Sequence, residues 1–194
     1  MRYYWEDETV MMKSINNNYE NSYEYAGNSA RLVITSLTDR CYQTLLAAFK
    51  QNLSGGPSGP SGTGKTETVR DCAKAFGRLC VVYNCSEEVT PEQMLQFFAG
   101  LATSGAWSCF DEFNRINYEV LSVIAQQHCC IQNTIASASE TFVLDKRTLK
   151  LNMSAAVCFT MNPGYAEITE LPDNIKAIFR PCAMMNPEIV FIFS

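Results

Sequence analysis

The sequence has little of several features that would assign it to common classes of protein. No apolar run reaches the roughly 20 residues that cross a bilayer, and residues 1–8 are polar and aromatic, unlike a secretory signal. Lys and Arg number 15 against 20 Asp and Glu, a net charge of −5, which argues against a general nucleic-acid-binding protein. We therefore expect a soluble intracellular protein that binds neither a membrane nor a nucleic acid.

Zinc-ligand patterns are also missing, although the chain has nine cysteines. Nine is an odd number, and no two cysteines form a C-x-x-C pair. Four lie inside apolar runs, where a reduced cysteine behaves as a small buried hydrophobic residue: Cys80, Cys85, Cys109 and Cys158. The only histidine, His128, precedes Cys129 and Cys130, a weak hint of a metal or redox site. The sequence favours plain packing for this group.

What the sequence does contain is a phosphate-binding motif. One segment fits G-x-x-x-x-G-K-[ST] at every defined position: Gly59, Pro60, Ser61, Gly62, Thr63, Gly64, Lys65 and Thr66. Glycines allow the backbone N–H groups to point inward at phosphate oxygens, and the helix expected over 66–76 adds its positive N-terminal end. Lys65 is then expected to reach the β- and γ-phosphates of ATP, and the Thr66 hydroxyl to bind Mg²⁺.

The alternative for this segment is a flexible linker, because residues 54–64 are rich in Gly, Ser and Pro. Linkers seldom finish in Gly-Lys-Thr and continue directly into a helix, so the motif is the better interpretation. A phosphate loop normally follows a buried strand. Residues 45–53 have a helical composition, however, and we expect any strand before the loop to be very short.

Strands and helices alternate along the rest of the chain. Uninterrupted apolar runs are typical of strands buried on both faces of a parallel sheet, and the pattern predicts an open α/β sheet flanked by helices. Expected strands cover 79–85, 107–110 and 155–161, with a short strand or extended piece over 31–35 and a hairpin over 141–144 and 148–151. Expected helices run from about 38 to 50, from 66 to 76, from Pro91 to Gly105, and around 120–125.

Polar residues follow two of the expected strands, at the edge where ligands bind in such sheets. Asp111 is a candidate for holding Mg²⁺, and Glu112 for polarising the attacking water. Asn162 is placed to hydrogen-bond the water or the γ-phosphate. Arg180, expected at a helix end, is either a surface arginine or one directed at a neighbouring subunit's nucleotide.

The motifs together resemble the first AAA+ module of a dynein heavy chain. The matching segments are residues 59–66, 105–116, 120–127, 160–165, 169–174 and 179–181, with 2–5, 23–25 and 32–42 nearer the amino terminus. The resemblance spans about Arg2 to Met185. It implies an AAA+ P-loop ATPase fold with three regions: an N-terminal segment (1–30) at the linker junction that packs on the core, the large ATPase subdomain (31–185) and a divergent tail (186–194).

The resemblance also implies roles for individual residues. Asp111 and Glu112 correspond to the Walker B pair, and Asn162 to the sensor-I residue. Arg180 corresponds to the finger that acts on an adjacent module. Three apolar residues before the first long helix correspond to the lining of the adenine pocket: Leu32, Val33 and Ile34. Other AAA+ modules of a dynein ring, microtubules, and dynein intermediate and light chains are the implied partners.

Departures from the family pattern accompany the match. Glu167-Ile168 stands where dyneins usually have Gly-Arg, and Ser36 replaces a proline. The chain ends where the family continues into a small helical lid, so the sequence reads as a truncated fragment that cannot move along a microtubule alone.

Three functions follow as hypotheses. The first is Mg²⁺-dependent ATP hydrolysis within a minus-end-directed microtubule motor, cytoplasmic and cytoskeletal, with a ciliary axoneme favoured over a cytoplasmic dynein. The second is a nucleotide-binding or interaction module without significant hydrolysis of its own. The third, a small-molecule kinase, lacks an acceptor site and an arginine-bearing lid.

Overall fold

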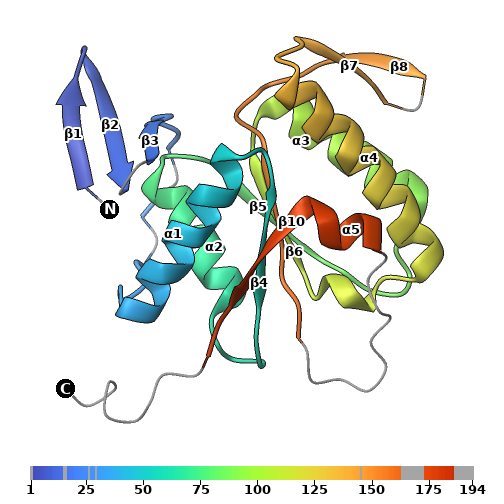
Figure 1. Ribbon diagram of the computed structural model, residues 1–194, viewed down its shortest axis with the longest axis horizontal. Coiled ribbons are helices and arrows are strands. Elements are labelled where there is room, and N and C mark those ends of the chain that lie inside the picture. The colour runs from blue at the N-terminus through green and yellow to red at the C-terminus, as the bar shows by residue number, and fades with distance from the viewer. Residues whose placement is uncertain are drawn as a thin grey trace.

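The computed structural model describes residues 2–14, 17–25, 27–28, 30–144, 146–162 and 173–185. Its centre is a five-stranded sheet in the order β10-β4-β9-β6-β5, in which every neighbouring pair is parallel (Figure 1). The strands are β4 (Ser54–Ser58), β5 (Cys80–Asn84), β6 (Trp107–Asp111), β9 (Ala156–Phe159) and β10 (Phe179–Ala183). The predicted open parallel α/β sheet is confirmed.

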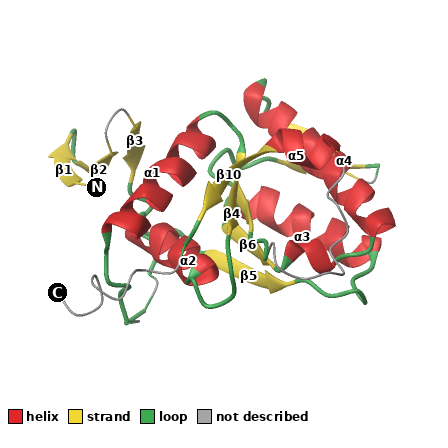
Figure 2. Cartoon of the chain, turned by 60° about the horizontal axis from the view of Figure 1, so that its bottom comes forward, coloured by secondary structure: helices red, strands yellow, loops and turns green. Residues whose placement is uncertain are grey.

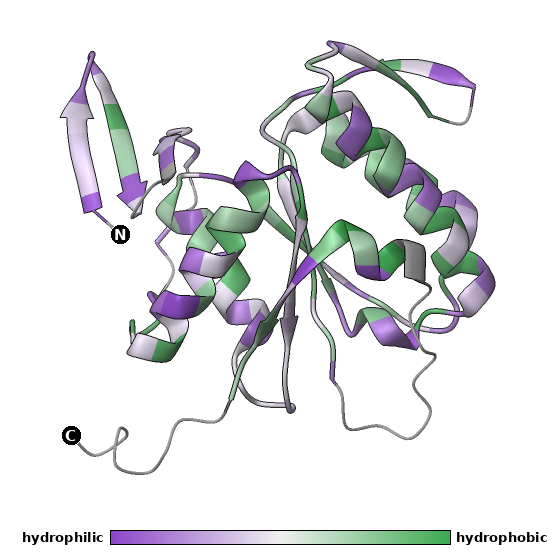
Figure 3. Cartoon of the chain, in the orientation of Figure 1, coloured by the Kyte–Doolittle hydropathy of each residue, from purple (hydrophilic) through white to green (hydrophobic). Residues whose placement is uncertain are grey.

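Helices cover both faces of this sheet (Figures 1 and 2). One layer holds α1 (Ser36–Lys50) and α2 (Lys65–Ala75), and the other holds α3 (Pro91–Ser104), α4 (Tyr118–Ala136) and the short α5 (Asp173–Ile178). The helices α1 and α4 carry both hydrophobic and hydrophilic stretches, as helices that cover a sheet do (Figure 3). The larger core cluster lies on the α3/α4 side and is rich in phenylalanine, with Phe98, Phe110, Phe113 and Phe159 almost fully buried.

The inner strand β4 is the main surprise, because its sequence Ser-Gly-Gly-Pro-Ser has low strand propensity. Close packing explains the composition. A Cβ on Gly55 would lie 2.3 Å from Leu45 Cδ2 on one face, and a Cβ on Gly56 would lie 2.5 Å from Phe179 Cδ2. The strand before the phosphate loop is thus five residues long, and the prediction of a very short one was wrong.

Most other elements lie where the sequence placed them. Strands β5, β6 and β9 and the hairpin of β7 (Thr141–Leu144) and β8 (Arg147–Lys150) are confirmed. Residues 31–35, expected to form a short strand or an extended piece, form no strand. Thr35 is instead the N-cap of α1, in a capping box with Thr38, so the helix begins at Ser36, two residues before the expected start at about 38.

Arg180 was expected at a helix end, and it lies two residues beyond α5, in the edge strand β10. Pro181 follows it there, and an edge strand tolerates a proline because one side of the strand needs no ladder hydrogen bond.

The amino-terminal residues form a second, antiparallel sheet that the sequence did not predict. It consists of β1 (Arg2–Glu6), β2 (Thr9–Ser14) and β3 (Asn17–Glu20). Met12, 1% exposed, packs with Leu46 of α1 and Phe76 at the end of α2, which joins this sheet to the main core. Within the described part of the chain, no helix is long and apolar enough to cross a membrane.

Candidate nucleotide-binding site

The phosphate loop connects the carboxyl end of β4 to the first turn of α2. Gly62 and Gly64 have positive φ angles of 81° and 75°, a conformation that favours glycine and turns the loop sharply. Gly64 is the N-cap residue of α2, so the free N–H groups of the first helical turn face the loop. A cavity of about 570 Å³ opens here, lined by Ser61, Gly62, Gly64, Lys65, Thr66, Glu67, Arg70, Cys80, Val82, Asn84, Asp111, Glu112 and Asn162.

The other predicted loop residues support the loop without lining this cavity. Thr63 Oγ1 donates a hydrogen bond of 2.9 Å to the carbonyl of Pro60. Gly59 meets the end of β10 so closely that a Cβ would lie 2.1 Å from the carbonyl oxygen of Met184. Glycine is therefore required at position 59 by packing, in addition to the motif.

Lys65 is folded back onto its own loop. Its Nζ donates hydrogen bonds of 2.9 Å to the Gly59 carbonyl and 2.8 Å to the Pro60 carbonyl, and the residue is 7% exposed. Burial lowers the pKa of the Lys65 ammonium, while the nearby Asp111 and Glu112 carboxylates act in the opposite direction. The amine thus has neutral carbonyl partners that an incoming phosphate, carrying full charge, is able to replace.

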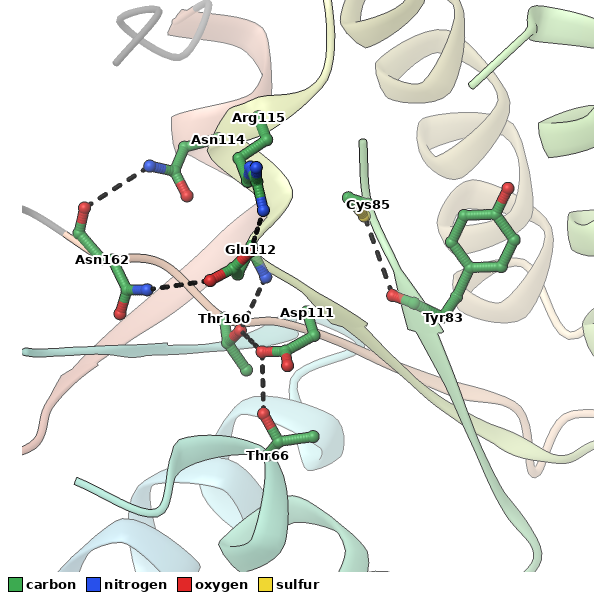
Figure 4. Close-up of polar contacts among 9 residues, drawn as sticks. All are labelled: Thr66, Tyr83, Cys85, Asp111, Glu112, Asn114, Arg115, Thr160 and Asn162. Atoms are coloured by element: carbon green, nitrogen blue, oxygen red, sulfur yellow. Dashed lines mark hydrogen bonds and ion pairs between the residues drawn. The ribbon is translucent and has the colours of Figure 1, made fainter. Parts of the chain in front are cut away.

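Asp111, the last residue of β6, joins three elements (Figure 4). Its Oδ1 accepts a hydrogen bond of 2.7 Å from Thr66 Oγ1 of α2, and another from Thr160 Oγ1, just beyond β9. Carboxylate and hydroxyl oxygens are the hard donors that Mg²⁺ prefers, and Mg²⁺ takes few protein ligands when phosphates and water supply the rest. The Thr66–Asp111 pair therefore fits the cation that accompanies a nucleotide.

Glu112 lies next to this pair in a left-handed backbone conformation, with φ of 54°. Its Oε2 is 2.6 Å from Nη1 of Arg115, and its Oε1 is 3.5 Å from Nδ2 of Asn162 (Figure 4). The structure thus brings Glu112 and the predicted sensor asparagine together, across the ends of two neighbouring strands. Asn162 is 6% exposed, and its Oδ1 has no hydrogen-bond partner, which leaves an acceptor for a ligand or water.

Sequence reasoning missed three residues of the site. Thr160 donates to Asp111 and accepts from the Glu112 backbone N–H at 3.1 Å, and Asn114 Nδ2 donates to the Asn162 carbonyl at 3.4 Å. Arg115 is the third. Thr160 stands two residues before Asn162 and Arg115 three after Glu112, spacings that could have indicated both.

Two groups of predicted residues are not brought to the phosphate cavity. Val33 and Ile34 are 79% and 55% exposed, and Leu32 lines an adjacent cavity, where its N–H donates to Asp71 Oδ1 at 3.3 Å. Arg180 is exposed on β10 and does not line the phosphate cavity. The substitution Glu167-Ile168 lies outside the described residues.

The single histidine is a core residue. His128 is 3% exposed, stacks on Phe98 and meets Phe159 edge-on. Cys129 and Cys130 are half-buried, and the described residues hold no group of three or more His, Cys, Asp or Glu that could bind a metal. Cys85, Cys109 and Cys158 are buried as predicted, and Cys80 is partly buried.

The parallel sheet, the phosphate loop after the inner strand β4 and the carboxylate at the end of β6 define a P-loop ATPase fold of the AAA+ type. The family model described as "Hydrolytic ATP binding site of dynein motor region" matches residues 21–194. The chain belongs to this family.

Relatives and a solved structure agree with this assignment. The chain is 57% identical over 192 residues to dynein axonemal heavy chain 12 of Homo sapiens and of Mus musculus, which covers 99% of this chain and 6% of each relative. It is 55% identical over 192 residues to human dynein axonemal heavy chain 3, of which it covers 5%. A putative ATPase from Cytophaga hutchinsonii has the same fold, with a TM-score of 0.52 at 16% identity over 81% of this chain and 46% of that one.

Proposed function

We propose that this chain binds ATP with Mg²⁺ and hydrolyses the γ-phosphate bond. The observation that carries the proposal is the 2.7 Å hydrogen bond between Thr66 of the phosphate loop and Asp111 of β6, because it joins the two halves of a nucleotide-metal site. The 570 Å³ cavity beside this pair has room for the phosphates.

Each side chain then has a distinct task. Lys65 leaves its loop carbonyls for the β- and γ-phosphates, while the loop N–H groups take further phosphate oxygens. Thr66 and Asp111 hold Mg²⁺, which neutralises charge on the phosphates when bound. Glu112 accepts the proton of the attacking water, and Asn162 orients that water or the phosphate. Leu32, Val33 and Ile34 are proposed to cover the adenine, which requires Val33 and Ile34 to lose solvent exposure on binding.

Arg180 is proposed to act in trans. Its exposed position on the edge strand β10, away from the residues that line the phosphate cavity, suits contact with a neighbouring module's nucleotide. The same reasoning implies that the site of this chain receives an arginine from another module.

The setting we propose is a dynein motor. The names of the relatives support an axonemal heavy chain, and hence a cilium or flagellum. We propose in addition a ring of AAA+ modules, intermediate and light chains as partners, and minus-end-directed movement along microtubules. The chain spans about a twentieth of these relatives, so the motor activity belongs to a larger assembly.

A second candidate function is nucleotide binding with negligible hydrolysis by the 194-residue chain alone. Both carboxylate oxygens of Glu112 have protein partners, so the proposed base is held back from a water molecule.

The variant Glu112→Gln separates the two functions. If the chain is an ATPase, the variant binds Mg²⁺-ATP as well as the parent chain does but hydrolyses it about 10²–10⁴-fold more slowly in a single-turnover assay. Equal slow rates in parent and variant would support the binding module. Equal rates typical of enzymes, about 1 s⁻¹ or more, would contradict the role of Glu112.

A further inference from the structure

Arg115 has no task in the proposed scheme, yet its guanidinium lies 2.6 Å from Glu112 Oε2 (Figure 4). The two side chains are 62% and 38% exposed. Exposed ion pairs often contribute little to stability, so the short distance alone assigns no function to this pair. Its backbone setting and its place beside the cavity are more informative.

The turn that carries Arg115 is fixed to the core at each step. Glu112 has a positive φ and is followed by the 3₁₀ turn η1 (Phe113–Arg115), in which the Arg115 N–H donates to the Glu112 carbonyl at 2.9 Å. Phe113 is fully buried against Phe159, with ring centroids 4.3 Å apart, and Asn114 donates to the Asn162 carbonyl. One tight turn therefore brings the Arg115 side chain back to Glu112. The backbone on both sides of the pair is held by the core.

The charges around the cavity indicate what the Glu112–Arg115 ion pair does. Two carboxylates follow one another at the end of β6, and Asp111 is committed to the Thr66 hydroxyl and a cation. Glu112 is left as a negative charge on the wall that a terminal phosphate approaches. Arg115 does not line the cavity, so it compensates Glu112 from behind without occupying the space of the phosphate.

We propose that Arg115 is a positioning residue for Glu112, which holds the carboxylate against the cavity wall and compensates its charge so that a third phosphate is admitted. The inference rests on the proposed function, since it requires Glu112 to face the terminal phosphate of ATP. ADP lacks that phosphate. Arg115 should therefore govern the preference of the site for ATP over ADP and have little effect on ADP itself.

The test is to measure the dissociation constants of ATP and ADP, both with Mg²⁺, by titration calorimetry on the folded chain. Arg115→Ala should weaken ATP binding about twofold to fivefold, the range expected for one exposed charge pair, and leave ADP binding unchanged. Arg115→Lys should recover part of the loss. Arg147→Ala removes the same charge from the exposed strand β8 and should change neither constant.

The background Glu112→Gln decides whether Arg115 acts through Glu112. With the carboxylate absent, the further change Arg115→Ala should no longer alter the ratio of the two constants. An equal loss of ATP affinity in both backgrounds would show that Arg115 acts on the phosphate directly, and an unchanged ratio in Arg115→Ala would also overturn the proposal. If the unmodified chain bound neither nucleotide, the proposed function would fail together with this role, whereas normal binding with an unchanged ratio would refute the role of Arg115 alone.

Discussion

The two ends of strand β4 hold polar groups in opposite ways. At the amino end, Ser54 is 1% exposed and its hydroxyl shares a hydrogen bond with Nε2 of His128, which is enclosed by Phe98 and Phe159. At the carboxyl end, Lys65 and Thr66 bond to loop carbonyls and to Asp111 beside an open cavity.

The difference teaches which polar contacts are available for function. The contacts at the carboxyl end can be exchanged for a ligand, because Lys65, Thr66 and Asp111 line the cavity and a phosphate or cation would replace their present partners. The contact at the amino end also borders a cavity, of about 260 Å³, but the lining of that cavity is mostly apolar and contains no phosphate loop, so we expect the Ser54–His128 contact to serve the core. Removing a polar contact should therefore alter mainly stability at the amino end and mainly ligand binding at the carboxyl end.

The largest expected effect concerns the glycines at the two ends. In Gly59→Ala the new Cβ would meet the backbone oxygen of Met184 at 2.1 Å, and backbone cannot move aside easily. In Gly55→Ala it would meet only side-chain atoms, Leu45 Cδ2 at 2.3 Å and Cys158 Sγ at 3.1 Å, and the end of a side chain gives way more easily than backbone. We expect a loss in unfolding free energy of about 3 kcal/mol for Gly59→Ala and about 1 kcal/mol for Gly55→Ala, measured by urea denaturation. The reverse order would contradict the packing at the phosphate loop.

The next effect is a pH dependence of the unfolding free energy, which arises from His128 at the amino end of β4. Burial lowers the pKa of His128 from 6.5 to about 4, so between these values the unfolded chain binds a proton that the folded chain does not. Stability should therefore fall as the pH drops from 6.5 towards 4, by about 3 kcal/mol from this residue. His128→Gln should flatten that part of the profile of unfolding free energy against pH.

Nucleotide affinity at neutral pH supplies the control for this variant. It should be the same in His128→Gln and the parent chain, because His128 does not line the phosphate cavity. An unchanged acid slope in the variant would show that other groups set the pH dependence.

The smallest expected effect is on the Mg²⁺ dependence of ATP affinity, at the carboxyl end of β4. Asp111→Asn keeps an oxygen that accepts from Thr66 and Thr160 but removes the charge, so stability should change little. The gain in ATP affinity on adding Mg²⁺ should fall about tenfold, as for other metal-site partners. The control is Glu67→Gln, which removes another carboxylate that lines the cavity, one that pairs with Arg70. This variant should keep the full gain in ATP affinity on adding Mg²⁺. Equal losses in both variants would mean that general charge, and not Asp111, sets the metal dependence.

Local patterns made much of this arrangement predictable. Apolar runs located β5, β6 and β9, and the fixed spacing of the phosphate-loop motif located Lys65 and Thr66. Because parallel strands end at a common edge, the positions of Asp111, Glu112 and Asn162 after strands were enough to predict that they would meet.

The missed features depend on tertiary contacts. Strand β4 is made of residues with little strand propensity, and its glycines are favoured by the close approach of Leu45, ten residues before Gly55, and of Phe179, far along the chain from Gly56. Likewise, Arg115 acquires significance only once the left-handed turn at Glu112 returns it to the carboxylate. The close packing at β4 has no signal in the surrounding residues, whereas the spacing of three residues between Glu112 and Arg115 is only a weak signal of their pairing.

The most direct test of the account is the affinity of the folded 194-residue chain for ATP, with and without Mg²⁺, beside Lys65→Ala. We predict Mg²⁺-dependent binding that weakens at least about tenfold in the variant, because the charged hydrogen bonds of Lys65 to phosphate are lost, whereas the bonds to the loop carbonyls that they replace are weaker. A folded chain that bound no ATP, or that bound it equally well after Lys65→Ala, would contradict the claim that this cavity is a nucleotide site.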